Sequence, residues 1–273
     1  MNNLHRELAP ISEEAWAQIE EELSRTFKRN LGARRVVDIN GPHGAKFACV
    51  GTGHLKPLKS QEAGIVVHQH EVQPLLQLRV PFELLREDID AAERGANDAD
   101  WQPVKEAAEK LAYTEDRVVF EGFAEGGIKG MRIGTSNPVL TLPGNPDDYP
   151  VVFAEALKQL RLAGVDGPYT IVMGAESYTT LLEASDDGYP VISHIRRLVP
   201  TDIVWAPAIE GAFVVSTRGG DFEMSLGRDL SIGYQSHDDK KVKLYLEETL
   251  TFRLFTPEAV VAINPAIKKL AKK

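Results

Sequence analysis

The sequence predicts an α+β protein from two kinds of pattern. Near its end, apolar residues alternate with polar ones in four successive segments, as expected for strands with one buried face: 222–226, 230–234, 242–246 and 250–254. Polar turns at 227–229 and 237–240 separate three of them. Two other stretches, 12–31 and 100–120, have the apolar spacing of helices with one buried side. We therefore expect a sheet and amphipathic helices.

Composition excludes several classes of protein. Of the 273 residues, 43% are hydrophobic and 26% are charged, which is typical of soluble proteins. The formal net charge of -9 argues against nucleic acid as the main partner, because phosphate binding requires a basic surface. The single cysteine, Cys49, rules out an internal disulfide. No apolar run is long enough to span a membrane, and the first residues do not resemble a signal peptide, so we expect a cytoplasmic location.

The first predicted helix covers residues 12–31. Ser12 can cap its N-terminus, and Gly32 is expected to end it. Its apolar stripe either packs on the protein's own core or lies on an inner surface that also receives a partner: Trp16, Ile19, Leu23, Phe27 and Leu31. The following residues, 34–39, are predicted to form a short strand.

Residues 47–82 are expected to be extended, because strand-like runs alternate there with glycines and Pro57. A long hairpin has little core of its own and is marginally stable alone in water. Another surface should therefore support it, and a neighbouring subunit is a suitable one.

The best helical pattern covers 100–120, with Pro103 in its first turn and Gly122 after its end. Residues 136–150 are rich in proline and polar residues, and they mark the entry into a separate lobe. In that lobe, we expect helices at 151–162 and 175–184, a loop at 185–190, a short helix, and strands at 169–173, 203–205 and 212–216.

Catalytic signatures are missing from the sequence. It contains no G-x-S-x-G, P-loop or H-E-x-x-H motif. His68 and His70 would face the same side of a strand, but no third metal ligand is placed beside them. Cys49 lacks the surroundings of a nucleophile and is expected to be buried. Three carboxylates near the end of the long helix are expected to form a solvated or salt-bridged face: Glu115, Asp116 and Glu121.

Several segments together resemble the encapsulin shell proteins, once called linocin-type bacteriocins. The resemblance covers nearly the whole chain and rests on the order and spacing of the segments, including LAPISEEAW (8–16), GARRVVDINGPHG (32–44), QPLLQLRVPF (73–82), GYPVISHIRRLV (188–199), RGGDFEMSLGRDLSIGY (218–234) and LYLEETLTFR (244–253).

This resemblance implies the fold of tailed-bacteriophage major capsid proteins and assembly into a closed icosahedral homo-oligomer of about 60 subunits. In family terms, the chain divides into an N-terminal helix and arm (1–45), an extended loop (46–78), a peripheral lobe with the long helix (79–133), an axial lobe with a pore loop (134–220), and peripheral-lobe strands with a C-terminal tail (221–273).

The resemblance also implies a partner. Encapsulins enclose a cargo enzyme, commonly a ferritin-like iron oxidase or a dye-decolourising peroxidase, for iron storage or defence against oxidative stress. A terminal peptide of the cargo docks on the inner wall. The positions that match this groove, whose apolar members could instead be ordinary core, are Phe27, Leu31, Arg34, Val36, Asp38, Ile39, Asp229, Leu230, Ile232 and Tyr234.

The loop 184–194 resembles the family's pore loop at the five-fold axis, and it contains Asp186, Asp187, Gly188, Tyr189 and His194. Acidic groups repeated around an axis would favour cations, although a solvated surface loop explains the same residues. Some members bind a flavin through a tryptophan in the segment that matches 81–90. Glu87 stands at that position here, so we expect no bound cofactor.

Two alternatives to a shell protein remain open. A hydrolase or bacteriocin-like enzyme would need a nucleophile or a metal constellation, and the sequence supplies neither. A phage major capsid protein would share the fold, but the helix that begins after Ser12 matches the inner-wall helix of encapsulins.

Overall fold

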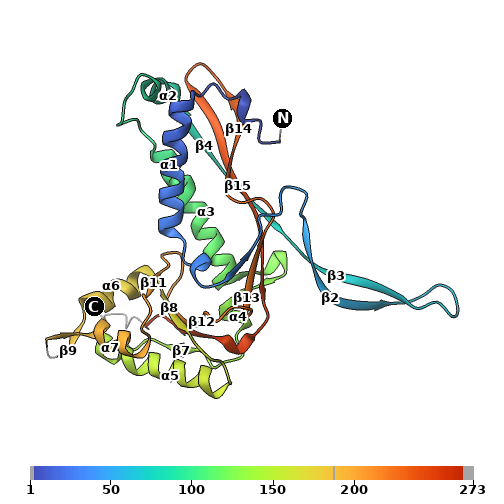
Figure 1. The fold of residues 1–273 in the computed structure, drawn as a ribbon, viewed down its shortest axis with the longest axis vertical. Coiled ribbons are helices and arrows are strands. Elements are labelled where there is room, and N and C mark those ends of the chain that lie inside the picture. Colours follow the sequence, from blue (N-terminus) through green and yellow to red (C-terminus); the bar gives the residue numbers. More distant parts are fainter. Residues whose placement is uncertain (1–2, 187, 267–273) are drawn as a thin grey trace, which may run out of the picture.

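The computed structural model describes residues 3–186 and 188–266 and shows two lobes with a long hairpin projecting from the side (Figure 1). The upper lobe contains a five-stranded sheet in which β15 is central. Its strands are β1 (Asp38–Asn40), β4 (Leu76–Leu85), β13 (Phe222–Leu226), β14 (Ser231–His237) and β15 (Lys241–Leu254). β4 pairs antiparallel with β15 from Leu85 opposite Lys241 to Leu76 opposite Leu250.

β15 differs from the sequence-based prediction. The alternation separated 242–246 from 250–254, whereas the structure has one continuous strand. The three residues between them, Glu247, Glu248 and Thr249, stay in the ladder opposite Arg79, Leu78 and Gln77. Glu247 and Glu248 are buried, at 2% and 0% exposed, so the prediction of an exposed polar face is wrong at the centre of this strand. Pairing with arginines makes this burial possible, as shown below.

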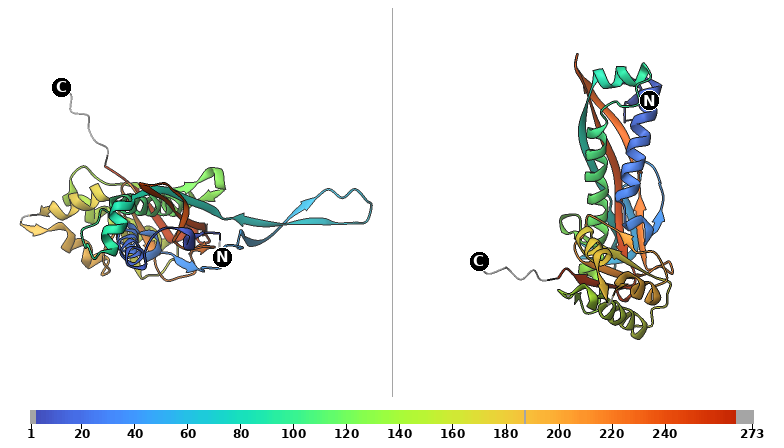
Figure 2. Two further views of the ribbon diagram at one scale, coloured as in Figure 1. Left: turned by 90° about the horizontal axis from the view of Figure 1, so that it is seen from above. Right: turned by 90° about the vertical axis from the view of Figure 1, so that its left-hand side faces the viewer.

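Two helices cover one face of this sheet (Figure 2). α1 (Glu13–Asn30) begins as predicted, with the Ala15 N–H donating to Ser12 Oγ at 3.3 Å. α3 (Gln102–Phe120) also confirms the prediction, with Pro103 in its first turn. A shorter helix, α2 (Arg86–Glu93), follows β4. The apolar stripe of α1 packs into a core shared with α3 and the sheet, and Trp16 lies at its edge.

The segment after α1 is not the strand predicted for 34–39. A 3-10 turn (Ala33–Arg35) precedes β1, which is only three residues long. The turn forms because the backbone N–H groups of Gly32 and Ala33 donate to the carboxylate of Asp116 on α3. Gly32 has a negative φ, so its backbone conformation does not require glycine. Close packing does, because an added Cβ would lie 2.6 Å from Ala206 Cβ.

The hairpin predicted in the extended region is confirmed. β2 (Cys49–Leu58) and β3 (Val67–Pro74) pair antiparallel and extend away from both lobes (Figure 2). Within the described residues, no second layer covers this ribbon, so apolar side chains stay exposed along it. Cys49, at its base, is likewise exposed, and the expectation of a buried thiol is wrong.

The lower lobe is built on a second five-stranded sheet in the order β11-β8-β12-β16-β7. The strands are β7 (Leu140–Thr141), β8 (Tyr169–Met173), β11 (Val204–Trp205), β12 (Ala212–Ser216) and β16 (Val260–Asn264). The helices are α4 (Met131–Gly134), α5 (Tyr149–Leu162), α6 (Ala175–Glu183) and α7 (Val191–Leu198). Two small ladders complete the fold: β5 (Gly122–Phe123) with β6 (Ile128–Lys129), and β9 (Ser185–Asp186) with β10 (Tyr189–Pro190).

β16 brings the end of the described chain into the lower sheet, between β12 and β7. The expected division placed all of 221–273 with the upper lobe, and the strand pairing differs from it here. The physical reason is the apolar run Val260–Val261–Ala262–Ile263, all fully buried, which needs a sheet covered on both faces. Among the described helices, none is long and apolar enough to cross a membrane.

Candidate functional site

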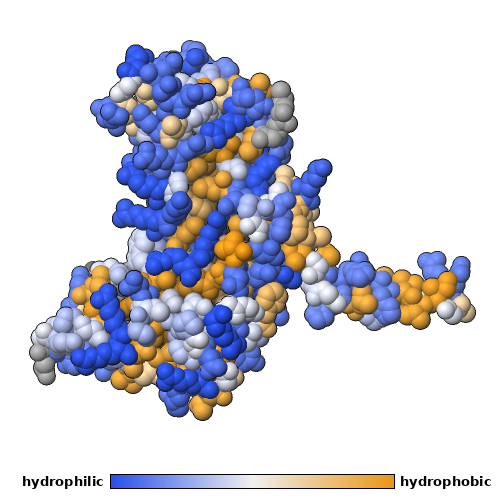
Figure 3. Space-filling view, in the orientation of Figure 1, coloured by the Kyte–Doolittle hydropathy of each residue, from blue (hydrophilic) through white to orange (hydrophobic). Residues whose placement is uncertain are grey.

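A cavity of about 490 Å³ lies beside the last turns of α1, where the chain enters β14. Five of the predicted groove residues line it: Phe27, Leu31, Arg34, Asp229 and Leu230. Ser24, Lys28 and Arg35 complete its wall and surround the apolar floor with polar groups. Figure 3 shows an apolar band on this face, next to α1 and flanked by hydrophilic side chains.

The other five predicted residues lie elsewhere. Val36 and Asp38 line a second cavity of about 180 Å³, and Asp38 Oδ2 accepts the Gly220 N–H at 2.6 Å. Ile39 is 40% exposed on β1. Ile232 is a core residue beneath α1 and α3. Tyr234 directs its hydroxyl to His237 Nδ1 at 2.6 Å. The structure therefore brings together only half of the predicted set.

Arg34 is fixed at the inner end of the groove by three carboxylates. Its Nε and Nη2 donate to Glu115 at 2.8 and 2.7 Å, a bidentate arrangement, and Nη1 lies 2.9 Å from Asp229 Oδ1. Nη2 also contacts Glu248. Because Glu115 and Glu248 are fully buried, the guanidinium is the cation that makes their burial possible. Arg34 therefore orders the floor of the groove.

The charges of this cluster shift the pKa values of its members. Burial alone would lower the pKa of the Arg34 guanidinium, but the hydrogen bond to Glu115 and the surrounding carboxylates raise it. Burial raises the pKa of Glu248, and the charge of Glu115 raises it further. Glu248 Oε2 has no hydrogen-bond partner in the described chain. Glu248 therefore tends to keep its proton, although it lies beside the positive charge of Arg34.

Asp116 holds the turn that carries Arg34. Its carboxylate is fully buried and accepts the N–H of Gly32 at 2.9 and 3.1 Å and that of Ala33 at 2.8 Å. Burial raises its pKa to about 7, against the opposing effect of these hydrogen bonds. The end of α1 is therefore tied to α3 through a carboxyl group that titrates near neutrality.

Sequence reasoning missed the importance of Glu115, Asp116 and Glu248. The helix-face prediction holds where a salt bridge forms, since Glu115 pairs with Arg34, and Glu121 lies 2.7 Å from Arg132 Nε. It is wrong for Asp116, which is buried and hydrogen-bonded to backbone groups. An available signal was that Glu115 and Asp116 continue the helical spacing of the apolar residues of α3, while Glu248 lies between two apolar segments of β15.

The expected pore loop is a small hairpin at one end of the lower lobe (Figure 1). Asp186 lies opposite Tyr189, and Gly188 is in the turn, whereas Asp187 lies outside the described residues. The Tyr189 ring meets His194 edge-on at 5.1 Å, and Arg197 Nη2 lies 3.3 Å from the Tyr189 hydroxyl. The Arg197 guanidinium on α7 thus lies beside the loop that carries Asp186.

We next searched the described part of the chain for side chains that could form a metal-binding site. It contains no group of three or more His, Cys, Asp or Glu side chains arranged to hold a metal ion. His68 and His70 lie on the exposed hairpin, opposite Pro57 and Leu55.

The two lobes, the long helix and the projecting hairpin form the fold of tailed-bacteriophage major capsid proteins, as predicted. The virus-like particle of Pyrococcus furiosus matches with a TM-score of 0.63 at 16% identity, covering 91% of this chain and 98% of that one. A chain of Gordonia phage Cozz matches with a TM-score of 0.55 at 13% identity, covering 86% of each.

Sequence comparison then identifies the family. The model of a family described as "Encapsulating protein for peroxidase" matches residues 1–251. The type 1 encapsulin shell protein of Mycobacterium tuberculosis is 55% identical over 97% of this chain and 100% of its own length. That of Rhodospirillum rubrum is 47% identical over 97% of each. The chain belongs to the encapsulin family, and it is a structural shell protein rather than an enzyme.

Proposed function

We propose that about 60 copies of this chain form a closed icosahedral shell in the cytoplasm, and that the shell encloses a cargo enzyme. The encapsulin family and its capsid fold support assembly. The description of the family names a peroxidase as the enclosed protein, which favours a dye-decolourising peroxidase and a role in oxidative-stress defence over a ferritin-like oxidase and iron storage.

The hairpin of β2 and β3 supports contact between subunits. Ile65 and Val66 at its tip are 53% and 79% exposed, and Leu55 on β2 is 51% exposed. Such apolar side chains on a ribbon without a second layer are costly to leave in water. We infer that a neighbouring subunit covers them.

The groove beside α1 is our proposed docking site for the terminal peptide of the cargo. Phe27, Leu31 and Leu230 provide an apolar floor for alternate side chains of an extended peptide. Asp229 is held by Arg34 at 2.9 Å and remains partly exposed, so it can accept hydrogen bonds from the peptide backbone. The observation that carries this proposal is that residues of α1 and residues just before β14 line the same cavity.

The decisive experiment measures cargo loading in shells with an altered groove. Leu230 is only partly buried, so Leu230→Asp should leave the subunit folded. The matched control is Leu162→Asp, at a leucine that is 78% exposed at the end of α5. Each shell is co-expressed with a fluorescent protein that carries the C-terminal peptide of a candidate peroxidase, and the bound fluorescence per shell is measured.

We expect Leu230→Asp to lower loading by roughly tenfold or more, because a buried apolar contact is replaced by an unpaired charge. Leu162→Asp should load normally. Equal loading of both intact shells would reject the groove as the docking site without rejecting shell formation.

We also propose that the loop containing Asp186, Tyr189 and His194 borders a pore for small solutes. The small hairpin at the end of the lower lobe is suitably exposed for this role. The Arg197 guanidinium near Tyr189 suggests that the solutes are not selected by negative charge alone.

A further inference from the structure

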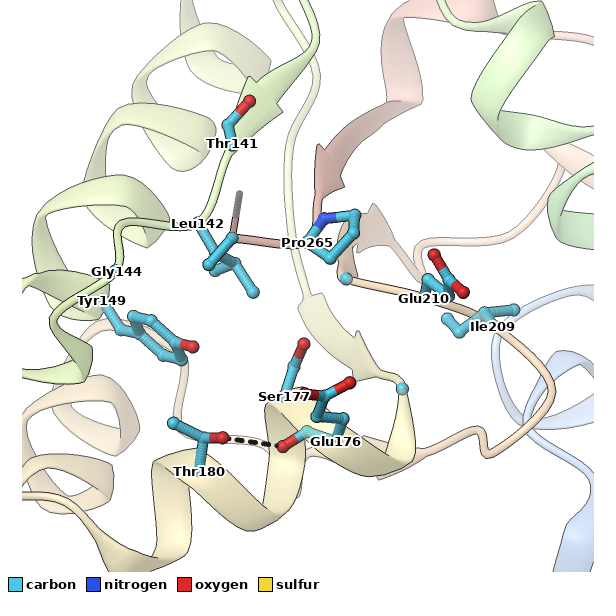
Figure 4. Close-up of a pocket in the computed structure, with 13 residues that line it drawn as sticks. Thr141, Leu142, Gly144, Tyr149, Glu176, Ser177, Thr180, Ile209, Glu210 and Pro265 are labelled. Carbon is cyan, nitrogen blue, oxygen red and sulfur yellow. Dashed lines mark hydrogen bonds between the residues drawn. The ribbon is translucent and has the colours of Figure 1, made fainter. Parts of the chain in front are cut away.

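Acidic side chains lie at more than one cavity of the described chain, but their burial differs. A wide cavity of about 970 Å³ lies in the lower lobe, between the start of α6 and the loop that leads into β12 (Figure 4). Its glutamates, Glu176 and Glu210, are exposed, so water can solvate them. Behind the proposed cargo groove, by contrast, Glu115 and Glu248 are fully buried. A proton on a buried acid alters its neighbours more, because charges interact more strongly away from water.

The wall behind the groove contains more acidic groups than basic ones. The side chains of Glu115 on α3 and Glu248 on β15 are 0% exposed, whereas that of Asp229, just before β14, is 42% exposed. All three carboxyl groups contact the guanidinium of Arg34. One cation does not balance three carboxylates, and an uncompensated charge is costly in a buried site. We therefore expect one of the buried acids to be neutral.

The other charged groups packed around this wall do not supply a second cation to it. Asp116 on α3 is a further acid, and its carboxyl group accepts the N–H groups of the turn after α1. Glu247 points to the opposite face of the sheet from its neighbour on β15 and pairs there with Arg79 and Arg228. Among the described residues, the two other cations that line the groove form no ion pair with the acids of the wall: Lys28 and Arg35.

Glu115 and Glu248 are placed to share one proton. Both accept a hydrogen bond from the same nitrogen, Arg34 Nη2, so their carboxyl groups lie side by side. Two carboxylates offer each other only acceptors, and Glu248 Oε2 has no hydrogen-bond partner among the described residues. A proton on Glu248 makes it a donor to Glu115. Burial raises the pKa of Glu248, and the charge of Glu115 and a hydrogen bond with it raise this pKa further, whereas Arg34 lowers it.

We propose that Glu248 holds this proton while cargo is bound, and that release of the proton in alkaline solution weakens cargo binding. The inference rests on the proposed docking site and gives a way in which that site is regulated. An ionised Glu248 would attract Arg34 more strongly than the partly exposed Asp229 does, because Glu248 is buried. Asp229 would then lose its partner, and the peptide would have to order this side chain on binding.

The test compares native shells with three variants. Glu248→Gln cannot titrate, but its amide oxygen can accept from Arg34 and its amide nitrogen can donate to Glu115, as a protonated Glu248 would. Asp116→Asn removes the titration of the neighbouring acid, whose pKa is about 7. Glu125→Gln, at an exposed glutamate in the 3-10 turn after β5, controls for the loss of one charge outside the groove.

Two measurements are made on assembled shells between about pH 6 and pH 9. Each shell encloses a fluorescent protein that ends in the C-terminal peptide of a candidate peroxidase, attached without a flexible linker. Its emission does not vary over this pH range, and time-resolved anisotropy gives the ratio of immobilised to freely tumbling cargo. Infrared difference spectra of empty shells, native minus Glu248→Gln, record the carbonyl band of a protonated Glu248.

In native shells, we expect the ratio of immobilised to free cargo to fall by roughly threefold to tenfold as the pH rises, the effect of one side chain that must be ordered. The raised pKa gives this sign, because the proton stays bound until the pH passes the raised value. Glu248→Gln should keep the high ratio throughout, which a misfolded variant would not do. Asp116→Asn and Glu125→Gln should retain the fall, and the carbonyl band should disappear over the same pH range.

Three results would reject this inference and leave the docking site in place. They are a constant ratio in native shells, an equal fall in Glu248→Gln, and a missing carbonyl band at the acidic end of the range. Loss of the pH dependence in Asp116→Asn would also reject it, since Asp116 would then be the responsible acid. No immobilised cargo at any pH would reject the docking site itself and this inference with it.

Discussion

At the scale of single residues, the carboxylates behind the groove determine the character of this site. Glu115 and Glu248 are fully buried and share Arg34, while Asp116 is buried with backbone donors only. Replacing one partner of such a cluster leaves an uncompensated charge in a low-dielectric environment. The groove floor is therefore fixed by electrostatics as well as by apolar packing.

Asp116 should make stability depend on pH. Its pKa is raised from 3.8 to about 7 in the folded chain, so the folded state binds a proton that the unfolded state has already released. This contribution to stability is fully present below the unfolded pKa and is lost as the pH rises through about 7. Asp116→Asn cannot titrate, although its side-chain oxygen can still accept from the turn.

We therefore expect the melting temperature of the native protein, relative to Asp116→Asn, to fall between pH 5 and pH 8. Thermal unfolding of both proteins across this range checks the sign. A difference that does not vary with pH, or that rises with it, would contradict the raised pKa.

At the scale of elements, the joint between α1 and the second lobe depends on close packing. Gly32 follows α1, and its Cα lies against Ala206, which is in the segment after β11. Neither backbone can retreat easily, because Gly32 is bonded to Asp116 and the N–H of Ala206 donates to the Met173 carbonyl at 2.9 Å. A single methyl group at position 32 should disturb this joint.

Gly32→Ala should lower the free energy of unfolding by about 1–3 kcal/mol, the typical cost of overpacking. Its φ is negative, so the loss would come from the 2.6 Å contact with Ala206 Cβ and not from backbone strain. Chemical denaturation measures the effect. The double variant Gly32→Ala with Ala206→Gly removes the contact and should recover part of the loss. No recovery would point to a cause other than this contact.

At the scale of the whole molecule, the hairpin of β2 and β3 carries several apolar side chains that the described part of the subunit does not cover. Its tip residues Ile65 and Val66 are 53% and 79% exposed. Because they contribute nothing to the core of the subunit, changes there separate assembly from folding.

Val66→Asp should therefore leave the subunit folded but reduce or abolish shell formation. Ile133→Asp, at an isoleucine of α4 that is 73% exposed, serves as the control. Size-exclusion chromatography with negative-stain microscopy distinguishes shells from free subunits. Normal shells from Val66→Asp would show that the hairpin tip is not part of an essential contact.

Much of the local structure follows from the sequence, because it depends on short-range periodicity. α1 and α3 appear at the predicted positions, and β8 and β12 have the predicted bounds. The predictions are wrong where the local structure depends on contacts with residues far away in the sequence. The residues after Gly32 form a turn because Asp116 binds their N–H groups, and β15 continues through Glu247 and Glu248 because arginines neutralise them.

The sequence by itself determined the fold class, the main helices and strands, and the family, since these depend on patterns and motifs along the chain. Only the tertiary structure decided which residues share the groove. It placed Leu230 beside Phe27 but Ile232 in the core, and it joined Arg34 to Glu115 and Glu248. The reason is that burial and ion pairing arise between residues far apart in sequence, so no local pattern records them.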